Sequence, residues 1–201
     1  MSTLHPAGPA AAVIATLWWV LLAGATVICL FVAALLVWAW RRPPGATDER
    51  RFVIGLGLGL PLVVLSALLA YGVVVGERLL PRAAPEVVTV HAEARQWAWR
   101  FAYDDAPGRE TEDILHIPAG RPVDVAITTA DVVHSFWVPR LAGKLDAVPG
   151  HVNTLRIEAY APGRYQGLSA EFSGRGYRDH GFEVIAHDAA DWQAFVTGET
   201  P

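Results

Sequence analysis

Two stretches in the C-terminal part of the chain carry residues suited to binding a metal ion. The first reads D-V-V-H-S-F-W-V-P from Asp131 to Pro139, and the second reads L-S-A-E-F-S-G-R-G-Y-R-D-H from Leu168 to His180. Imidazole and carboxylate groups such as theirs hold zinc or a single cupric ion in proteins. Folding must bring the two stretches together before they can share an ion. The candidate ligands in this part of the chain are His116, His134, His151, His180 and Glu171.

The second stretch resembles the copper-binding loop in subunit II of the haem-copper terminal oxidases. In copper-bearing members this loop runs C-x-E-x-C-x-x-x-H-x-x-M, and the first stretch supplies a further histidine to the binuclear centre called CuA. In this alignment His134 and Glu171 match the family. The other ligand positions depart from it, because they hold Ser169, Ser173, Tyr177 and His180.

Serine at the two cysteine positions removes the chemistry on which CuA depends. A mixed-valence copper pair needs two bridging thiolates, which are soft ligands and delocalise the electron. The hydroxyls of Ser169 and Ser173 are hard and stay protonated near neutral pH, and the only cysteine, Cys29, lies in a distant apolar run. The resemblance therefore implies a domain without CuA and without any cofactor of its own, which is the condition of the bo-type quinol oxidases.

Further motifs extend the resemblance over most of residues 86–187. The run R-Q-W-A-W-R-F-A-Y, which begins at Arg95, resembles the family's aromatic strand, in which Trp97 matches the tryptophan that passes electrons to CuA. Without copper, we expect Trp97 to be a subunit contact or a vestigial electron-transfer position. The family's counterpart of Glu171 helps to hold Mg²⁺ at the boundary with subunit I. That role needs no thiolate, so for Glu171 a magnesium site and an interface hydrogen bond both stay open.

Two long apolar runs lie in the N-terminal part of the chain. The protein has 201 residues, 53% of them hydrophobic, and residues 10–40 and 52–76 contain no charged side chain. Each run exceeds the roughly 20 residues that a helix needs to cross a bilayer. We therefore expect residues 1–85 to form an N-terminal segment, a two-helix transmembrane hairpin and a linker that begins at Gly76.

The charges around these runs predict their orientation. Four arginines (Arg41, Arg42, Arg50 and Arg51) lie between the runs, and no Lys or Arg precedes the first run. Short loops rich in Lys and Arg stay in the cytoplasm. We expect a multi-pass protein of the bacterial inner membrane, with both termini and the C-terminal domain in the periplasm. A signal peptide is the alternative for the first run, which is too long for one and lacks a basic start.

Residues 86–201 are expected to form one all-β domain. Short runs rich in Val, Ile, Thr and aromatic residues alternate there with turn residues, and seven or so strands suit a Greek-key sandwich of the cupredoxin kind. Asp188 is expected to cap a closing helix that reaches Phe195. The region is acidic, with ten Lys and Arg against seventeen Asp and Glu. The expected strands are residues 87–93, 96–103, 114–117, 122–128, 152–160, 164–168 and 181–186.

The resemblance implies a subunit that does no chemistry itself. The chain has no haem-attachment motif and no phosphate loop, so the haems, the copper of the O₂ site (CuB) and the quinol site would belong to subunit I. We expect the structural, capping subunit II of a proton-pumping ubiquinol oxidase in the respiratory chain, in contact with subunit I and other oxidase subunits and with no nucleic acid partner. Three alternatives stay open: subunit II of a cytochrome c oxidase that lost CuA, a membrane-anchored metal-binding module, and a subunit of an oxidase branch with a different acceptor.

Overall fold

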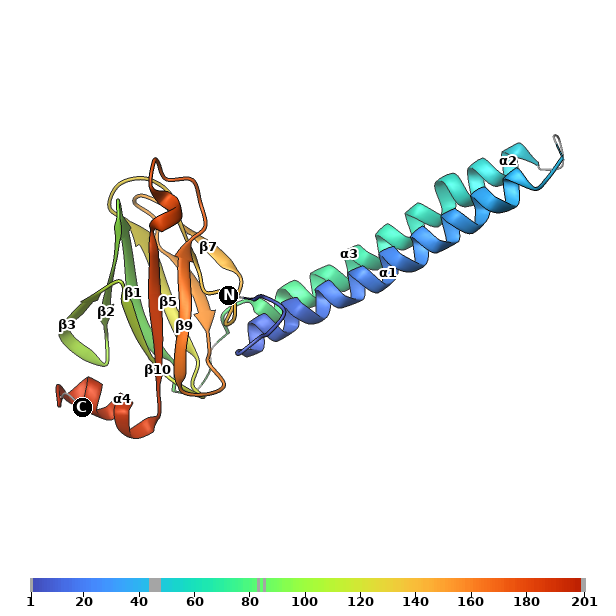
Figure 1. Cartoon of the computed structure of the whole chain (residues 1–201). Coiled ribbons are helices and arrows are strands. Elements are labelled where there is room, and N and C mark those ends of the chain that lie inside the picture. Colours follow the sequence, from blue (N-terminus) through green and yellow to red (C-terminus); the bar gives the residue numbers. More distant parts are fainter. Residues whose placement is uncertain (1, 44–47, 83, 85, 200–201) are drawn as a thin grey trace. The chain divides into compact units, whose positions relative to one another are not determined.

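The computed structural model describes residues 2–43, 48–82, 84 and 86–199 and divides into two compact units. One unit, residues 16–79, is a helical hairpin, and the other joins residues 1–15 to residues 80–201 in a β-sandwich (Figure 1). The sequence prediction divides the chain at residues 85 and 86 instead. The sandwich thus includes a short N-terminal stretch that the division by composition assigns to the membrane part.

The helical unit contains most of the first apolar run and all of the second. Helix α1 (Pro9–Trp40) is followed, after the loop, by α2 (Glu49–Phe52), the π-helical segment η1 (Val53–Gly59) and α3 (Leu60–Leu79). By length and composition, Pro9–Trp40 and the continuous run Glu49–Leu79 are both able to cross a membrane. Four residues of the predicted linker, 76–79, are helical. Residues 44–47 of the predicted cytoplasmic loop lie outside the described residues.

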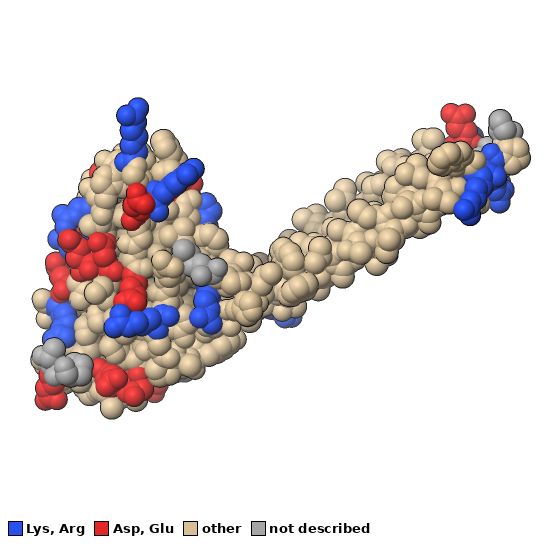
Figure 2. Space-filling model, viewed as in Figure 1, with Lys and Arg blue, Asp and Glu red and all other residues tan. Residues whose placement is uncertain are grey.

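The surface of the hairpin agrees with two membrane helices. Figure 2 shows charged side chains over the sandwich and near the loop end of the hairpin, while the sides of the helices in between are uncharged. The π-helical turns precede Pro61, whose missing N–H cannot complete the regular helical ladder. Many large apolar side chains of α1 and α3 are exposed, as lipid-facing residues would be.

Within the described residues, one five-stranded sheet has the order β3-β2-β1-β5-β8. Strand β1 pairs antiparallel with β2 but parallel with β5, so the chain must leave this sheet and return to it. The intervening strand, β4, belongs to the second sheet. The strands of the first sheet are β1 (Val88–Arg95), β2 (Ala98–Tyr103), β3 (Ala106–Glu112), β5 (Val123–Thr129) and β8 (Asn153–Ile157).

The second sheet has the order β4-β10-β9-β6-β7. Its inner face packs on the inner face of the first sheet, and alternate residues of both sheets form the core, among them Trp99, Phe101 and Phe136. This is the expected two-sheet sandwich. The strands of the second sheet are β4 (Ile114–Pro118), β6 (His134–Trp137), β7 (Lys144–Ala147), β9 (Gly163–Ser169) and β10 (Gly181–His187).

Three of these strands were not predicted. Strand β3 is polar and contains Pro107 and Gly108, which argue against a strand except at a sheet edge, and β3 is an edge strand. Strands β6 and β7 have four residues each, too few to show an alternating pattern. The predicted strand 152–160 is shortened to β8. The closing helix α4 (Ala189–Thr197) is confirmed, and the Asp188 carboxylate accepts hydrogen bonds from the N–H groups of Ala190 and Asp191.

The N-terminal stretch is held against the sandwich by backbone hydrogen bonds. The Ala7 N–H donates to the Arg140 carbonyl (2.8 Å), and the Tyr160 N–H donates to the Ala7 carbonyl (2.8 Å). Gly8 is required here, because a Cβ atom at this position would lie 2.1 Å from the Glu158 carbonyl oxygen. This close approach fixes the point from which α1 starts.

Candidate functional site

Three strands of the second sheet bring together the two stretches that carry the candidate ligands. His134 opens β6, Ser169 ends β9, and His180 lies directly before β10. The Ser169 N–H donates to the His180 carbonyl (2.9 Å), and the Ala170 N–H donates to the Ser135 carbonyl (2.9 Å). The order β10-β9-β6 therefore places residues that are distant in sequence at one end of the sheet.

Four of the predicted site residues form one buried cluster. The side chains of His134, Ser169, Ser173 and His180 are all buried. The rings of His134 and His180 lie 5.1 Å apart between centroids and stand nearly at right angles. We call these four residues the His–Ser cluster.

Two tryptophans flank this cluster. Trp99, which is fully buried, stacks on the His180 ring at 5.8 Å, and Trp97 meets the same ring edge-on at 5.9 Å. Trp97 is 41% exposed. The pair therefore joins the buried cluster to the surface, and Trp99 is a neighbour that sequence reasoning treated only as part of an alternating strand.

Asp131 orients the cluster and was missed as a site residue. Its carboxylate accepts hydrogen bonds from the His134 ring (3.0 Å) and from the N–H groups of Gln96 (2.7 Å) and Val132 (2.6 Å). Partial burial opposes ionisation, but these bonds outweigh it and lower the pKa of Asp131 to about 2. The carboxylate is thus ionised at neutral pH and fixes Nε2 of His134. The spacing D-x-x-H was the only signal in the sequence.

The cluster contains polar atoms without partners. Among the described residues, every buried side-chain nitrogen or oxygen that lacks a hydrogen bond lies in the cluster or beside it, in Trp99 and Ser135. In the cluster these atoms are His134 Nδ1, the hydroxyls of Ser169 and Ser173, and both ring nitrogens of His180. Burial and the neighbouring His134 lower the pKa of His180, although contacts with the Ala98 backbone and with nearby carboxylates oppose this. The lowered pKa therefore favours the neutral form of the buried His180 imidazole.

The fold and the motifs agree with known proteins. Residues 108–188 match the family of cytochrome c oxidase subunit II periplasmic domains. Cytochrome c oxidase subunit 2 of Alkalihalophilus pseudofirmus is 28% identical over 98% of this chain and 62% of its own length. Quinol oxidase subunit 2 of Bacillus cereus is 35% identical over 54% of this chain and 37% of its own length. Residues 108–188 therefore form a periplasmic domain of the cytochrome c oxidase subunit II family.

Solved structures of subunit II share its fold. The periplasmic domain of subunit II of cytochrome oxidase from Bradyrhizobium japonicum has a TM-score of 0.53 at 24% identity, over 59% of this chain and 95% of that one. A chain of a haem-copper terminal oxidase dimer gives a TM-score of 0.53 at 25% identity, over 66% of this chain and 98% of that one. The chain spans 37% to 62% of the length of the two curated relatives above.

The donor set of the His–Ser cluster does not fit CuA. The two bridging positions present hydroxyl groups, which lack the soft, deprotonated sulfur that a mixed-valence copper pair requires. Cys29 lies in α1, in the other structural unit. No group of three or more His, Cys, Asp or Glu side chains in the described part of the chain is arranged to hold a metal ion. We therefore assign no electron-transfer step to this cluster.

Tyr177 and Glu171 lie at the margin of the cluster. Tyr177 begins η2 (Tyr177–Asp179), and its ring contacts the exposed Phe172 at 5.3 Å. One carboxylate oxygen of Glu171 accepts the Phe172 N–H (3.0 Å), and the other lies 3.8 Å from the Lys144 ammonium. At the surface, Glu171 is therefore paired with a cation of the chain itself.

The other candidate histidines do not join the cluster. His116 bonds to His187 across β4 and β10, with ring nitrogens 2.7 Å apart, and both rings stack near Phe195 of α4. His151 is exposed in the turn after β7. The candidate ligands are therefore not all brought together: β10 and β9 separate β4, which carries His116, from β6, which carries His134.

Proposed function

We propose that this chain is subunit II of a proton-pumping quinol oxidase, in which a quinol such as ubiquinol is oxidised and O₂ is reduced to water. Electrons then enter through a quinol site on subunit I, which would also carry the haems and CuB. The chain contributes two helices that clamp subunit I and an outer domain that caps it. The chain does no chemistry itself and supports catalysis by holding subunit I in position.

The pair of serines in the His–Ser cluster supports this function best. Ser169 and Ser173 are buried where CuA needs cysteine, and the fold around them is kept: β9 and β10 are paired, and Asp131 orients His134. A domain that retains its architecture but has lost its soft ligands is suited to docking and not to carrying electrons. The name of the Bacillus cereus relative, quinol oxidase subunit 2, points the same way.

Subunit II of a cytochrome c oxidase without CuA is the second candidate. Two observations favour it: the relative that aligns over nearly the whole chain is named cytochrome c oxidase subunit 2, and Trp97 is partly exposed beside His180. In this case Trp97 and the acidic outer domain would receive a basic electron donor. A membrane-anchored metal-binding module has less support, because His116 and His151 lie away from the cluster.

Glu171 is a candidate ligand for Mg²⁺ at the interface with subunit I. Its carboxylate is a suitable hard donor. In the chain by itself Lys144 neutralises part of its charge, so binding of Mg²⁺ requires the Lys144 side chain to turn away. A hydrogen bond from subunit I to Glu171 is the other role that fits.

The identity of the electron donor is tested on the intact complex. The complex is purified through a tag on this chain, and O₂ uptake is measured with a short-chain ubiquinol and with reduced cytochrome c. We expect turnover with the quinol, none above background with cytochrome c, and no near-infrared mixed-valence copper band.

The Trp97→Phe variant separates the two candidates further. Quinol-driven O₂ uptake should be unchanged in this variant, because electrons do not pass through the outer domain. Turnover with cytochrome c but not with quinol, together with a loss of rate in Trp97→Phe, would reject the quinol oxidase assignment in favour of the second candidate.

A further inference from the structure

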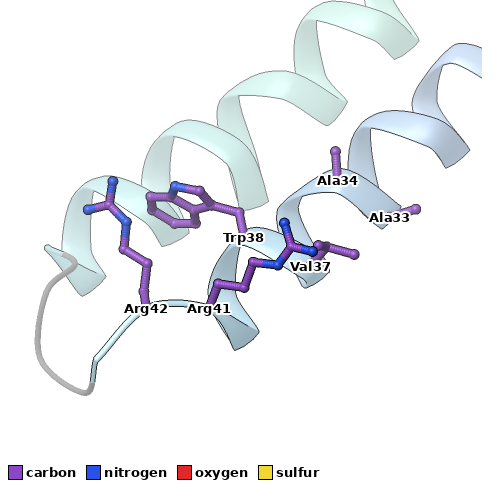
Figure 3. Close-up of a pocket in the computed structure, with 6 residues that line it drawn as sticks. All are labelled: Ala33, Ala34, Val37, Trp38, Arg41 and Arg42. Carbon is purple, nitrogen blue, oxygen red and sulfur yellow. The ribbon is translucent and has the colours of Figure 1, made fainter.

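A groove lies along one side of α1 close to its C-terminal end. It measures about 620 Å³ and is lined by Ala33, Ala34, Val37, Trp38, Arg41 and Arg42. These positions recur at intervals of three and four residues and therefore share one face of the helix. Figure 3 shows the two arginines at the end of the helix beside Trp38, with the small side chains of Ala33 and Ala34 further along.

The two ends of the groove differ in chemistry. Its inner part is apolar and shallow, because the small side chains of Ala33, Ala34 and Val37 line it. Its mouth carries the guanidinium groups of Arg41 and Arg42, and Arg42 lies over the Trp38 ring, 4.4 Å from its centroid. In the described part of the chain, neither arginine forms an ion pair with a carboxylate. The mouth thus carries two positive charges that are not neutralised.

This combination fits one kind of occupant better than others. A second apolar helix packed into the groove would bury the two guanidinium groups against it without a negative partner, which is costly. A phospholipid supplies a phosphate for the arginines and an acyl chain for the apolar part. Arginine and tryptophan near the end of a membrane helix also lie at the depth of lipid headgroups.

We propose that this groove binds an anionic phospholipid, with its headgroup phosphate held by Arg41 and Arg42 and an acyl chain along Ala33, Ala34 and Val37. The inference goes beyond the function of the complex and requires only that α1 lies in a bilayer. The lipid would lie in the leaflet on the side of the arginine loop.

The chain offers matched controls for both parts of the groove. Arg50 and Arg51 lie in α2, directly after the loop, and do not line the groove; Arg51 also pairs with Asp48 at 3.2 Å. Trp40 lies two residues from Trp38 but is 92% exposed, against 38% for Trp38. Variants at these positions remove the same charge or the same ring while leaving the groove intact.

The test compares lipid binding to the full-length chain in nanodiscs of phosphatidylcholine with and without phosphatidylglycerol. Bound lipid is counted by native mass spectrometry. We expect a preference for phosphatidylglycerol that falls on the order of tenfold in R41Q/R42Q and in W38L. R50Q/R51Q and W40L should keep it. Equal losses in R41Q/R42Q and R50Q/R51Q would mean diffuse attraction to the loop and would overturn the site, as would the absence of any preference in the wild type.

A second measurement identifies the occupant in the assembled complex. A photo-crosslinking residue at position 33 is activated in native membranes, and we expect adducts of phospholipid mass. Adducts to another protein subunit would show that a helix fills the groove and would overturn the proposal. Glycerol phosphate should not displace the phospholipid from the groove, because it lacks an acyl chain. Full competition by glycerol phosphate would mean that the apolar half of the groove takes no part in binding and would overturn the proposal. Failure of the chain to enter either bilayer would reject its membrane anchoring and this site together.

Discussion

At the scale of single residues, the His–Ser cluster combines a retained scaffold with altered donors. Asp131 and Trp99 hold the two imidazoles in place, while the hydroxyls of Ser169 and Ser173 are buried without a partner. A buried polar group that lacks a hydrogen bond costs about 1–3 kcal/mol. The serines are therefore an energetic burden on the fold unless they bind something that the function needs.

Replacing the two serines tests this directly. If the hydroxyls serve no ligand, Ser169→Ala and Ser173→Ala should each raise the free energy of unfolding by about 1 kcal/mol, because a buried unpaired group is removed. The measurement is chemical denaturation of the full-length chain in detergent. Asp131→Ala is the matched control and should lower the free energy of unfolding by about 2 kcal/mol, because it leaves several donors unsatisfied. A loss of stability in both serine variants would mean that the hydroxyls hold a bound species.

At the scale of elements, helix α4 is docked through a stack of aromatic and imidazole rings. Phe195 packs on His116 at 4.3 Å, and the Arg109 guanidinium lies over the Phe195 ring, 4.7 Å from its centroid. Burial, the charge of His187 and the charge of Arg109 together lower the pKa of His116 from 6.5 to about 4. The docked helix therefore requires a neutral His116.

Acid should weaken this docking. Between about pH 6.5 and pH 4 the unfolded chain binds a proton at His116 that the folded chain does not, so the stability is complete above this range and falls as the pH decreases. Burial also lowers the pKa of His187, against the raising effect of Asp191 and Asp188. The rings of Tyr103 and Trp192 also contact His116 and His187, respectively, and carry no charge near neutral pH.

Thermal unfolding, followed by tryptophan fluorescence at pH 7 and pH 5, checks this prediction. The wild type should melt at a lower temperature at pH 5, and His116→Gln should reduce the difference. An unchanged pH dependence in His116→Gln would place the titrating group elsewhere.

At the scale of the whole molecule, the sandwich has the fold of subunit II periplasmic domains, while serine occupies two positions at which CuA would need cysteine. If the sandwich alone sets the geometry of the loop, restoring the donor atoms should restore the centre. We expect the full-length variant S169C/S173C/Y177H/H180M to bind a binuclear copper centre with a near-infrared mixed-valence band. S169C alone is the control and should lack the band. A folded quadruple variant that binds no copper pair would mean that the loop geometry itself has diverged.

Much of this architecture could be predicted from sequence, and the reasons for the misses are physical. The hairpin, α4 and the longer strands follow from uncharged runs, a capping aspartate and alternating patterns. Strands β6 and β7 are too short to alternate, and β3 is an edge strand whose polar side chains resemble a loop. The His–Ser cluster followed from motif order. The hydrogen bond from His134 to Asp131 could not be predicted, and neither could the separation of His116 from the cluster. Both depend on which strands become neighbours.

The backbone bonds of Ala7 have a practical consequence for anyone who wishes to study the sandwich apart from its membrane helices. A fragment that begins at residue 86 would lack the partner of the Arg140 carbonyl and of the Tyr160 N–H. It would also uncover the surface against which Gly8 is pressed. A soluble version should therefore carry residues 2–15 joined by a designed linker to residue 80, so that the first segment of the chain continues to close the sandwich.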